Sequence, residues 1–183
     1  MNNTQRKGSQ LVADLVSVKN ISLAAVLIAL GVIIASFLKF PVSGSIASPG
    51  QHMINGLAGV LLGPVWAAVI AICIGSIRIM LGIGTIFSMP GGIPGAVVVG
   101  LFQLLMKRWG QKYRAFAALT EPIGTLLIGL PLAVYIFAPV QNIPMSLITV
   151  FFGWALSCFS GAIISFVILE PLRRTGLIER IVE

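Results

Sequence analysis

Few side chains in this sequence can form strong hydrogen bonds, and two of them share one face of a predicted helix. His52, Asn55 and Gly59 are separated by three and four residues, a spacing that places them on the same side of a helix. In a membrane, that face cannot point at lipid without leaving an imidazole and an amide unpaired. We therefore expect His52 and Asn55 either to contact a bound substrate or to tie their helix to its neighbours by hydrogen bonds.

Other candidate substrate-binding residues lie in or near a segment rich in glycine. Residues 82–95 hold five glycines and two prolines, and their backbone amides could donate to a hydroxyl or an anion; the alternative is a tight turn followed by close helix packing. This segment contributes Thr85 and Ser88 to the candidates. Arg78 could be a donor in the pocket or could reach the outer headgroups. Trp154 could stack on a flat ring or pack in the core.

Glu121 is the only acidic residue well inside an apolar segment. A carboxylate inside a membrane usually has a function. Glu121 follows Arg114 by about 10 Å on the cytoplasmic half of its predicted helix. That depth favours a structural or gating hydrogen bond over contact with a ligand bound near the outer surface.

The sequence contains no motif for catalysis. It lacks a phosphate-binding loop of the form GxxxxGK[ST], an HExxH metal motif and a nucleophile elbow around a serine. Its carboxylates form no pair at helical spacing inside a predicted span, and no cysteine pair has the spacing of a metal site. We therefore predict no enzyme activity, no catalytic residue, no metal site and no cofactor, and we expect that the chain cannot hydrolyse ATP by itself.

The composition indicates which solvent these residues face. Hydrophobic residues make up 57% of the 183 residues and charged residues only 9%, whereas soluble domains are about one quarter charged. Long apolar runs without a polar stripe predict an all-α, polytopic protein of the plasma membrane. We expect six transmembrane helices, at about 21–38, 49–63, 64–81, 88–106, 116–138 and 144–169.

The second of these helices is expected to be short. Gly63-Pro64 combines a residue that ends helices with one that begins them, so one helix stops and the next starts with almost no loop. About fifteen residues span roughly 22 Å, less than the ~20 residues of a typical membrane span.

Positive charges orient the predicted helices. Ten of the twelve lysines and arginines fall on one side of this topology, and the positive-inside rule places that side in the cytoplasm. Both termini are then cytoplasmic, and the net charge of +7 needs no nucleic-acid partner. We divide the chain into a polar cytoplasmic N-terminal segment at 1–20, a single six-helix membrane domain at 21–170 and a cytoplasmic tail at 171–183.

The first predicted helix carries a strip of small side chains that includes Ala25 and Ala29. Small residues allow helices to approach closely, whether within one protein or between subunits. From spacing alone, packing inside the protein is the favoured interpretation.

Several motifs follow one another in an order that resembles a known family of membrane proteins. They are Ala25-x-x-x-Ala29, His52 with Asn55, Gly59 through Gly63-Pro64, Arg78, Gly82-x-Gly84-Thr85, Pro90-Gly91-Gly92-Ile93-Pro94-Gly95-Ala96 and Glu121-Pro122-Ile123-Gly124-Thr125. This order, from about Ser22 to Arg173, resembles the substrate-binding S components of energy-coupling factor (ECF) vitamin importers. It is most similar to the ThiW family, which is associated with the thiazole part of thiamine.

The resemblance implies a module without catalytic activity that captures hydroxyethylthiazole from outside the cell. It would dock on a separate transmembrane coupling subunit driven by two ATPase subunits, and Ala25 and Ala29 match the alanine motif used for that docking. In the wider class, the loop after the first helix and the last three helices hold the ligand near the outer surface. Here Val42 to Ser48 contains no aromatic residue, so a residue such as Phe87 or Trp154 would have to stack on the ring.

Three other functions stay open. The chain could be an S component for another vitamin-like molecule. A self-sufficient secondary transporter would need coupling groups inside the membrane or inverted repeats, and a single Glu121 without an evident repeat argues against it. In an accessory subunit without a ligand, His52, Asn55 and Arg78 would all be satisfied by the protein itself.

Overall fold

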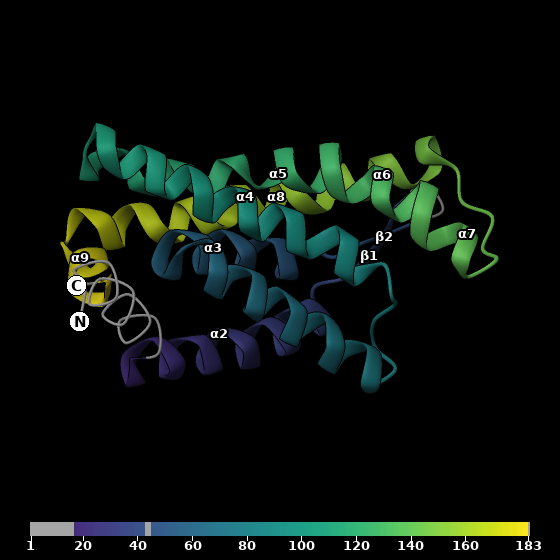
Figure 1. The fold of residues 1–183 in the computed structure, drawn as a ribbon, viewed down its shortest axis with the longest axis horizontal. Helices are drawn as coiled ribbons and strands as arrows, with labels where there is room; N and C mark the ends of the chain where they lie inside the picture. Colours follow the sequence, from purple (N-terminus) through teal and green to yellow (C-terminus); the bar gives the residue numbers. More distant parts are fainter. Residues whose placement is uncertain (1–16, 43–44, 183) are drawn as a thin grey trace, which may run out of the picture.

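The computed structural model describes residues 17–42 and 45–182 of the 183. Most of the predicted N-terminal segment lies outside these residues. The described chain consists of helices, connecting loops and one short hairpin (Figure 1). Within it, five helical segments are long and apolar enough to cross a membrane. An all-α, multi-pass membrane protein is therefore confirmed.

Helix α2 spans Val18–Phe37, close to the predicted first helix. The hydroxyl of Ser17 caps its start by accepting a hydrogen bond from the backbone N–H of Asn20 at 3.2 Å. One face of α2 is buried against α3, through Ala24, Leu27, Gly31 and Ala35. The other side of α2 is largely exposed, and α2 is the least buried of the five spans.

A hairpin that the sequence did not predict follows α2. Strands β1 (Phe40–Val42) and β2 (Ser45–Ala47) pair antiparallel, with Phe40 opposite Ala47. Three residues per strand are too few to give an alternating pattern that stands out from a loop. The hairpin packs against α8. It thereby holds the chain after α2 at the end of the bundle where α3 begins.

Helix α3 covers Pro49–Met80 but reverses direction at Gly63, as the Gly63-Pro64 pair predicts. Gly63 has φ 79° and ψ −177°, a conformation that glycine adopts far more readily than other residues. The guanidinium of Arg78 donates a hydrogen bond to the side chain of Gln51, 27 residues away. In a continuous helix these two residues would lie about 40 Å apart, so the two arms of α3 fold back on each other. Counting the arms separately would give six helices, a number that stays a prediction.

Helix α4 (Ser88–Trp109) packs closely along the first arm of α3. A Cβ atom added to Gly59 would lie 2.5 Å from Cγ1 of Val99, and one added to Gly100 would lie 2.4 Å from Cα of Pro64. Such contacts let the two backbones touch. They favour the interpretation in which the small residues on α4 serve close helix packing.

Residues 111–140 form one helical segment whose pitch changes along its length. Its prolines, at positions 122, 131 and 139, remove backbone donors and interrupt the regular pattern of hydrogen bonds. The segment starts five residues before the predicted helix at 116–138. Its parts are a 3-10 helix over Gln111–Thr120, α5 (Glu121–Gly124), a π-helix over Thr125–Gly129, α6 (Leu130–Leu132), a π-helix over Ala133–Phe137 and α7 (Ala138–Val140).

The last long helix, α8, spans Leu147–Arg174, and a short helix α9 follows at Leu177–Val182. The predicted boundaries of 144 and 169 are therefore wrong at both ends. Ser146, in an extended conformation, precedes the first helical residue, and Pro171 lies within the last turn, where the helix continues for three more residues. The helix thus extends into the segment predicted as a tail.

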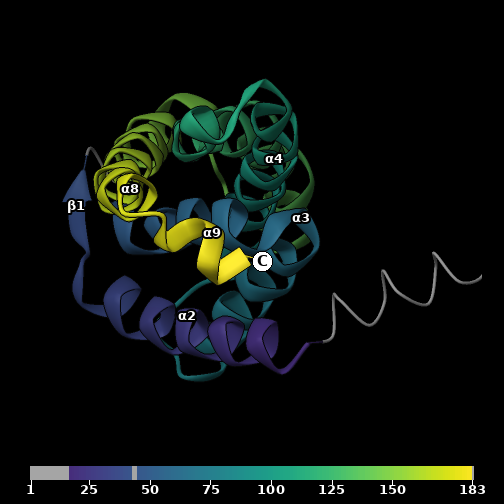
Figure 2. The ribbon, with the colours of Figure 1, turned by 90° about the vertical axis from the view of Figure 1, so that its left-hand side faces the viewer.

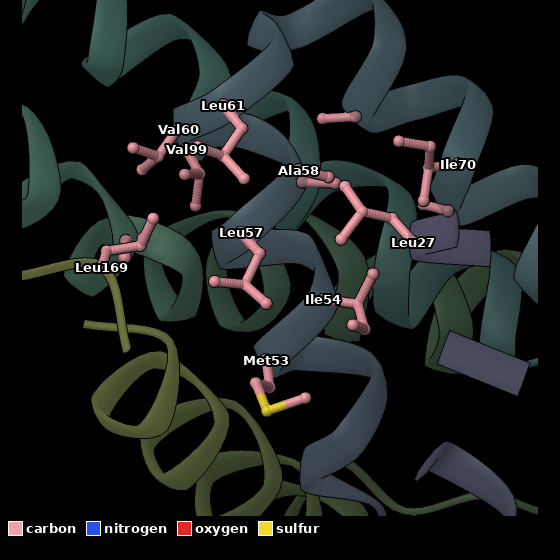
Figure 3. Close-up of a cluster of buried hydrophobic side chains, with 14 of the residues drawn as sticks. Leu27, Met53, Ile54, Leu57, Ala58, Val60, Leu61, Ile70, Val99 and Leu169 are labelled. Atoms are coloured by element: carbon pink, nitrogen blue, oxygen red, sulfur yellow. The ribbon is translucent and has the colours of Figure 1, made fainter. Parts of the chain in front are cut away.

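Helix α3 lies in the middle of the molecule, between α2 and a layer formed by α4, residues 111–140 and α8 (Figures 1 and 2). The main hydrophobic core surrounds its arms, with Ile54 and Ile70 fully buried beside Leu27, Val99 and Leu169 (Figure 3). Outward-facing residues of the long helices are mostly large and apolar, as expected of a surface that contacts lipid.

Most of the described basic residues gather at one end of the bundle; Lys39 and Arg78 do not. Lys19 donates a hydrogen bond to the carbonyl of Arg180, and the start of α2, the end of α4 and α9 lie together on the left of Figure 1. The hairpin and the connection from α3 to α4 lie at the other end. The predicted cytoplasmic orientation depends on this separation of most basic residues from the hairpin end of the bundle. The orientation itself stays a prediction.

Candidate functional site

A cavity of about 150 Å³ lies at the end of the bundle opposite most of the basic residues. The hairpin, both ends of α3, the connection to α4 and the first half of α8 surround it. Its lining combines apolar, aromatic and polar side chains with two cations. The lining residues are Lys39, Ile46, Ser48, Gln51, His52, Arg78, Ile83, Gly84, Thr85, Phe87, Ser88, Gly91, Trp154 and Ser157.

The structure brings five of the six predicted substrate-binding residues to this one cavity. They come from three different parts of the chain, because α3 doubles back at Gly63 and α8 returns beside it. These residues are His52, Arg78, Thr85, Ser88 and Trp154. Their contact with substrate stays a prediction, but a shared cavity is what that prediction requires.

Arg78 forms part of the wall of the cavity and is only 5% exposed. Its Nη1 donates to Oε1 of Gln51, and Nε2 of Gln51 in turn donates to the carbonyl of Ser88 at 3.1 Å. These bonds join the two ends of α3 to the start of α4. The burial of Arg78 disagrees with the alternative in which its side chain extends to the outer headgroups.

Lys39 also lines the cavity, close enough to Arg78 for the two positive charges to repel each other. Its Nζ donates to the carbonyl of Ile83. Burial, and then the nearby positive charge of Arg78, lower the pKa of Lys39 below its ordinary value. The cavity therefore has a positively charged side, formed by two residues that are far apart in the sequence.

An aromatic side chain forms another wall. The ring of Trp154 lies over the backbone of Gly91, where an added Cβ would come within 3.2 Å of Cη2. A side chain at position 91 would thus push against the ring. Phe87 also lines the cavity, so both aromatic residues named as stacking partners from the sequence are at the site.

Beneath the cavity, one carboxylate oxygen connects three segments of the chain. Glu121 is fully buried, and its Oε1 accepts hydrogen bonds from Nδ1 of His52 at 2.7 Å, Nδ2 of Asn55 at 3.1 Å and Oγ1 of Thr125 at 2.9 Å. Asn55 also donates to the carbonyl of Gly92 on α4 at 3.0 Å. The single hydroxyl proton of Thr125 is shared between Oε1 of Glu121 and the carbonyl of Gly91 on α4, which lies 3.1 Å away. The network fixes α3, α4 and α5 to one another.

Two sequence expectations change with this network. Asn55 does not line the cavity and is 1% exposed, so the geometry favours the alternative in which it ties its helix to the neighbours. Glu121 makes the expected structural hydrogen bond. It lies directly behind His52, however, and so is closer to the cavity than we expected from its predicted position in the cytoplasmic half of its helix. The 3-10 helix before it rises about 2.0 Å per residue instead of 1.5 Å, which carries Glu121 farther from Arg114.

Ala25 and Ala29 lie on the exposed side of α2. The buried face of that helix is formed by other residues, Ala24 and Leu27 among them. Packing inside the protein, which spacing alone favoured, is therefore wrong for these two alanines. Docking on another subunit stays a prediction.

Comparison with known families matches residues 21–175 to ThiW, described as thiamine-precursor transporter protein. The chain belongs to this family. The match confirms the resemblance drawn from the motifs, and it assigns the chain to a family of transporters of a thiamine precursor. No curated protein and no solved structure matches the chain.

In this ThiW-family chain, the described residues contain no group of three or more His, Cys, Asp or Glu side chains that could hold a metal ion. What the site offers is a concave volume, an aromatic wall and donors in fixed positions. Such an arrangement suits reversible binding of a small molecule.

Sequence reasoning missed two polar residues at the site of this ThiW-family chain. Neither Gln51 nor Lys39 was predicted from the sequence to contact substrate. Both have a polar side chain at the end of an apolar run, which is a weak signal because helix ends commonly carry such residues. Ser157, whose Oγ accepts a hydrogen bond from the backbone N–H of Ser48 at 2.9 Å, also lines the cavity.

Proposed function

We propose that this protein is the substrate-binding S component of an ECF-type importer and that it captures hydroxyethylthiazole from outside the cell. The observation that carries the proposal is the cavity of about 150 Å³ with an aromatic wall and several hydrogen-bond donors. Binding sites for small molecules are concave and hold a few placed polar groups that fix the orientation of the ligand. Membership of a family of thiamine-precursor transporters supports the choice of ligand.

Hydroxyethylthiazole presents a flat ring, a ring nitrogen that accepts a hydrogen bond, and one hydroxyl group. In the proposed complex the ring lies against Trp154 or Phe87. Glu121 holds Nδ1 of His52, which leaves the other ring nitrogen of His52 for the ligand. Thr85 and Ser88 complete the polar lining on the side of α4.

The energy for import would come from other subunits, because the sequence contains no phosphate-binding loop. We assign the exposed side of α2, with Ala25 and Ala29, to the transmembrane coupling subunit of a module with two ATPase subunits. Two observations support this assignment: both alanines face outward, and α2 is the least buried span. Small side chains let another helix approach closely.

One observation favours a second candidate, a self-sufficient secondary transporter. Glu121 and His52 form a buried pair that could exchange protons inside the membrane. A proton-coupled carrier needs such a group next to its substrate site, and His52 lines the cavity. The S-component proposal and this candidate predict the same ligand site but a different source of energy.

The test measures binding of radiolabelled hydroxyethylthiazole to the purified chain without ATPase subunits. We expect saturable binding, weakened by Trp154→Ala by roughly three- to tenfold, the effect of an aromatic contact of about 0.5–1.5 kcal/mol. Trp109→Ala is the matched control, because Trp109 is 67% exposed at the far end of α4.

Absence of binding to the folded chain would refute the proposed ligand. Stronger competition by an unrelated vitamin would instead assign the site to another S-component substrate. Uptake into liposomes that contain only this chain, driven by a proton gradient, would favour the secondary transporter.

A further inference from the structure

The positive side of the cavity is built around one loop. The carbonyl of Arg78 accepts hydrogen bonds from the backbone N–H groups of Ile83 at 3.0 Å and Gly84 at 2.9 Å. Lys39 donates to the carbonyl of the same Ile83. The two cations are therefore held on the same short loop, and both line the cavity, whose lining contains no carboxylate.

The guanidinium of Arg78 has more donors than the described residues satisfy. A guanidinium carries five N–H donors, and the described residues give Arg78 one acceptor, Oε1 of Gln51. Its Nε is buried without a partner in the described chain. A charge that is 5% exposed and faces only neutral acceptors is costly to keep in the folded protein. A negative group in the cavity would offset that cost.

The described carboxylates cannot supply this negative charge. Glu121 is bonded to His52, and Glu170 pairs with Arg173 at 2.7 Å and Arg174 at 2.9 Å. The third described carboxylate lies on α9, at the opposite end of the bundle (Figure 1). Among the described residues, the two cations of the cavity thus have no ion pair.

We propose that the side of the cavity formed by Lys39 and Arg78 binds an oxyanion, so that the preferred ligand is a thiazole-type precursor whose arm ends in a phosphate monoester. This inference rests on the proposed function and specifies its substrate class; the neutral alcohol is then the weaker ligand. A planar guanidinium can donate two parallel bonds to an oxyanion, and an ammonium group adds a second charge. The phosphate of a lipid headgroup has the same chemistry and must be distinguished from the substrate.

The experiment compares three probes on the purified full chain in a non-ionic detergent without phospholipid. The probes are hydroxyethylthiazole, its phosphate monoester and inorganic phosphate. We expect the monoester to bind roughly tenfold or more tightly than the alcohol, the effect of a hydrogen bond to a charged group. The difference should shrink as salt is added, because Lys39 is partly exposed.

Substitution of Lys39 tests the assignment directly. Lys39→Gln should reduce the ratio of monoester to alcohol affinity by roughly tenfold, and Lys39→Arg should retain most of it. Lys107→Gln, which removes a cation from the far end of α4, should leave the ratio unchanged. Lys39 is preferred to Arg78 for this test because loss of the bond to Gln51 could disturb the fold.

The pH dependence gives a further readout. Burial and the charge of Arg78 lower the pKa of Lys39 from its usual 10.5. Only protonated Lys39 attracts the anion, and the phosphate monoester keeps its second negative charge only above about pH 6. Monoester affinity should therefore be greatest between that pH and the pKa of Lys39 in the folded protein. It should fall as the pH rises through that value, starting below 10.5, and the fall should be absent in Lys39→Gln.

The outcomes separate this inference from the proposed function. If the alcohol binds and the monoester binds no more tightly, the inference is overturned and the proposed function stands. If neither thiazole binds, both fail. Inorganic phosphate binding as tightly as the monoester would overturn the inference, because the ring would then contribute nothing.

Lipid provides the last arm of the experiment. Phosphatidylglycerol is added in mixed micelles to the chain with bound monoester. The inference predicts tight monoester binding without phospholipid. The opposite result has two parts: the monoester binds no more tightly than the alcohol, and phosphatidylglycerol binds in a way that Lys39→Gln abolishes. Together they would assign the two cations to a lipid headgroup and overturn the inference.

Discussion

Replacement of Asn55 by alanine separates the two roles that the sequence allowed for this residue. The side-chain amide donates to the carbonyl of Gly92 at 3.0 Å and to Oε1 of Glu121 at 3.1 Å. A hydrogen bond to a neutral group contributes about 0.5–1.5 kcal/mol and one to a charged group about 1.5–3 kcal/mol. We therefore expect Asn55→Ala to lower the free energy of unfolding by roughly 2–4 kcal/mol.

The assay is reversible unfolding in mixed detergent micelles, followed by circular dichroism. Gln103→Ala is the matched control, because Gln103 is also a buried amide on a long helix, 3% exposed, and its Oε1 has no partner in the described chain. Gln103→Ala should lower the free energy of unfolding clearly less than Asn55→Ala does. Ligand affinity, measured on protein that is still folded, should change less for Asn55→Ala than for His52→Ala, since only His52 lines the cavity.

Two results would refute this reasoning. A loss of stability no greater than that of Gln103→Ala would mean that the network around Glu121 does not hold the helices together. Unchanged stability combined with a loss of affinity of roughly five- to 150-fold, the effect of one lost buried hydrogen bond, would mean that Asn55 contacts the ligand as the sequence first allowed.

Three further predictions concern packing, coupling and orientation. Gly161→Ala should destabilise the fold by about 1–3 kcal/mol in thermal unfolding, because the added Cβ would lie 2.6 Å from the Cβ of the histidine in the network; an unchanged melting temperature would mean that α8 can shift freely. Replacing Ala25 and Ala29 together by leucine should abolish uptake in cells while the isolated chain keeps its ligand affinity, and equal loss of both would count against docking. A cysteine at Arg180 should resist an impermeant thiol reagent in intact cells while one at Ser45 reacts; labelling of position 180 from outside would contradict the predicted orientation.

Much of the fold could be predicted because its signals are local. Apolar runs gave the helices, and Gly63-Pro64 gave the reversal of α3, since glycine reaches a positive φ and proline begins a helix easily. The least accurate boundaries are those of α8, where Pro144 lies at the predicted start and Pro171 just beyond the predicted end. Proline tolerates the neighbourhood of a helix end as well as it breaks a helix interior, so its position alone does not fix the boundary.

The candidate site was predictable as a set of residue types but not as a set of contacts. His52, Arg78 and Trp154 stand out because polar and aromatic groups are expensive or rare inside an apolar helix. The bond between His52 and Glu121 joins residues 69 positions apart, and no periodicity in either segment reports it. Lys39 was missed because a lysine at a helix end is usual.

By itself, the sequence determined that this protein lies in the membrane, where its helices turn and which side chains are too polar to face lipid. Only the tertiary structure decided which of those side chains meet. The depth and rotation of each helix follow from close backbone contacts, such as Gly95 on α4, where an added Cβ would lie 2.3 Å from Oε1 of Glu121. Because these contacts depend on several helices at once, they place Asn55 in the network and leave Lys39 and Arg78 facing the cavity.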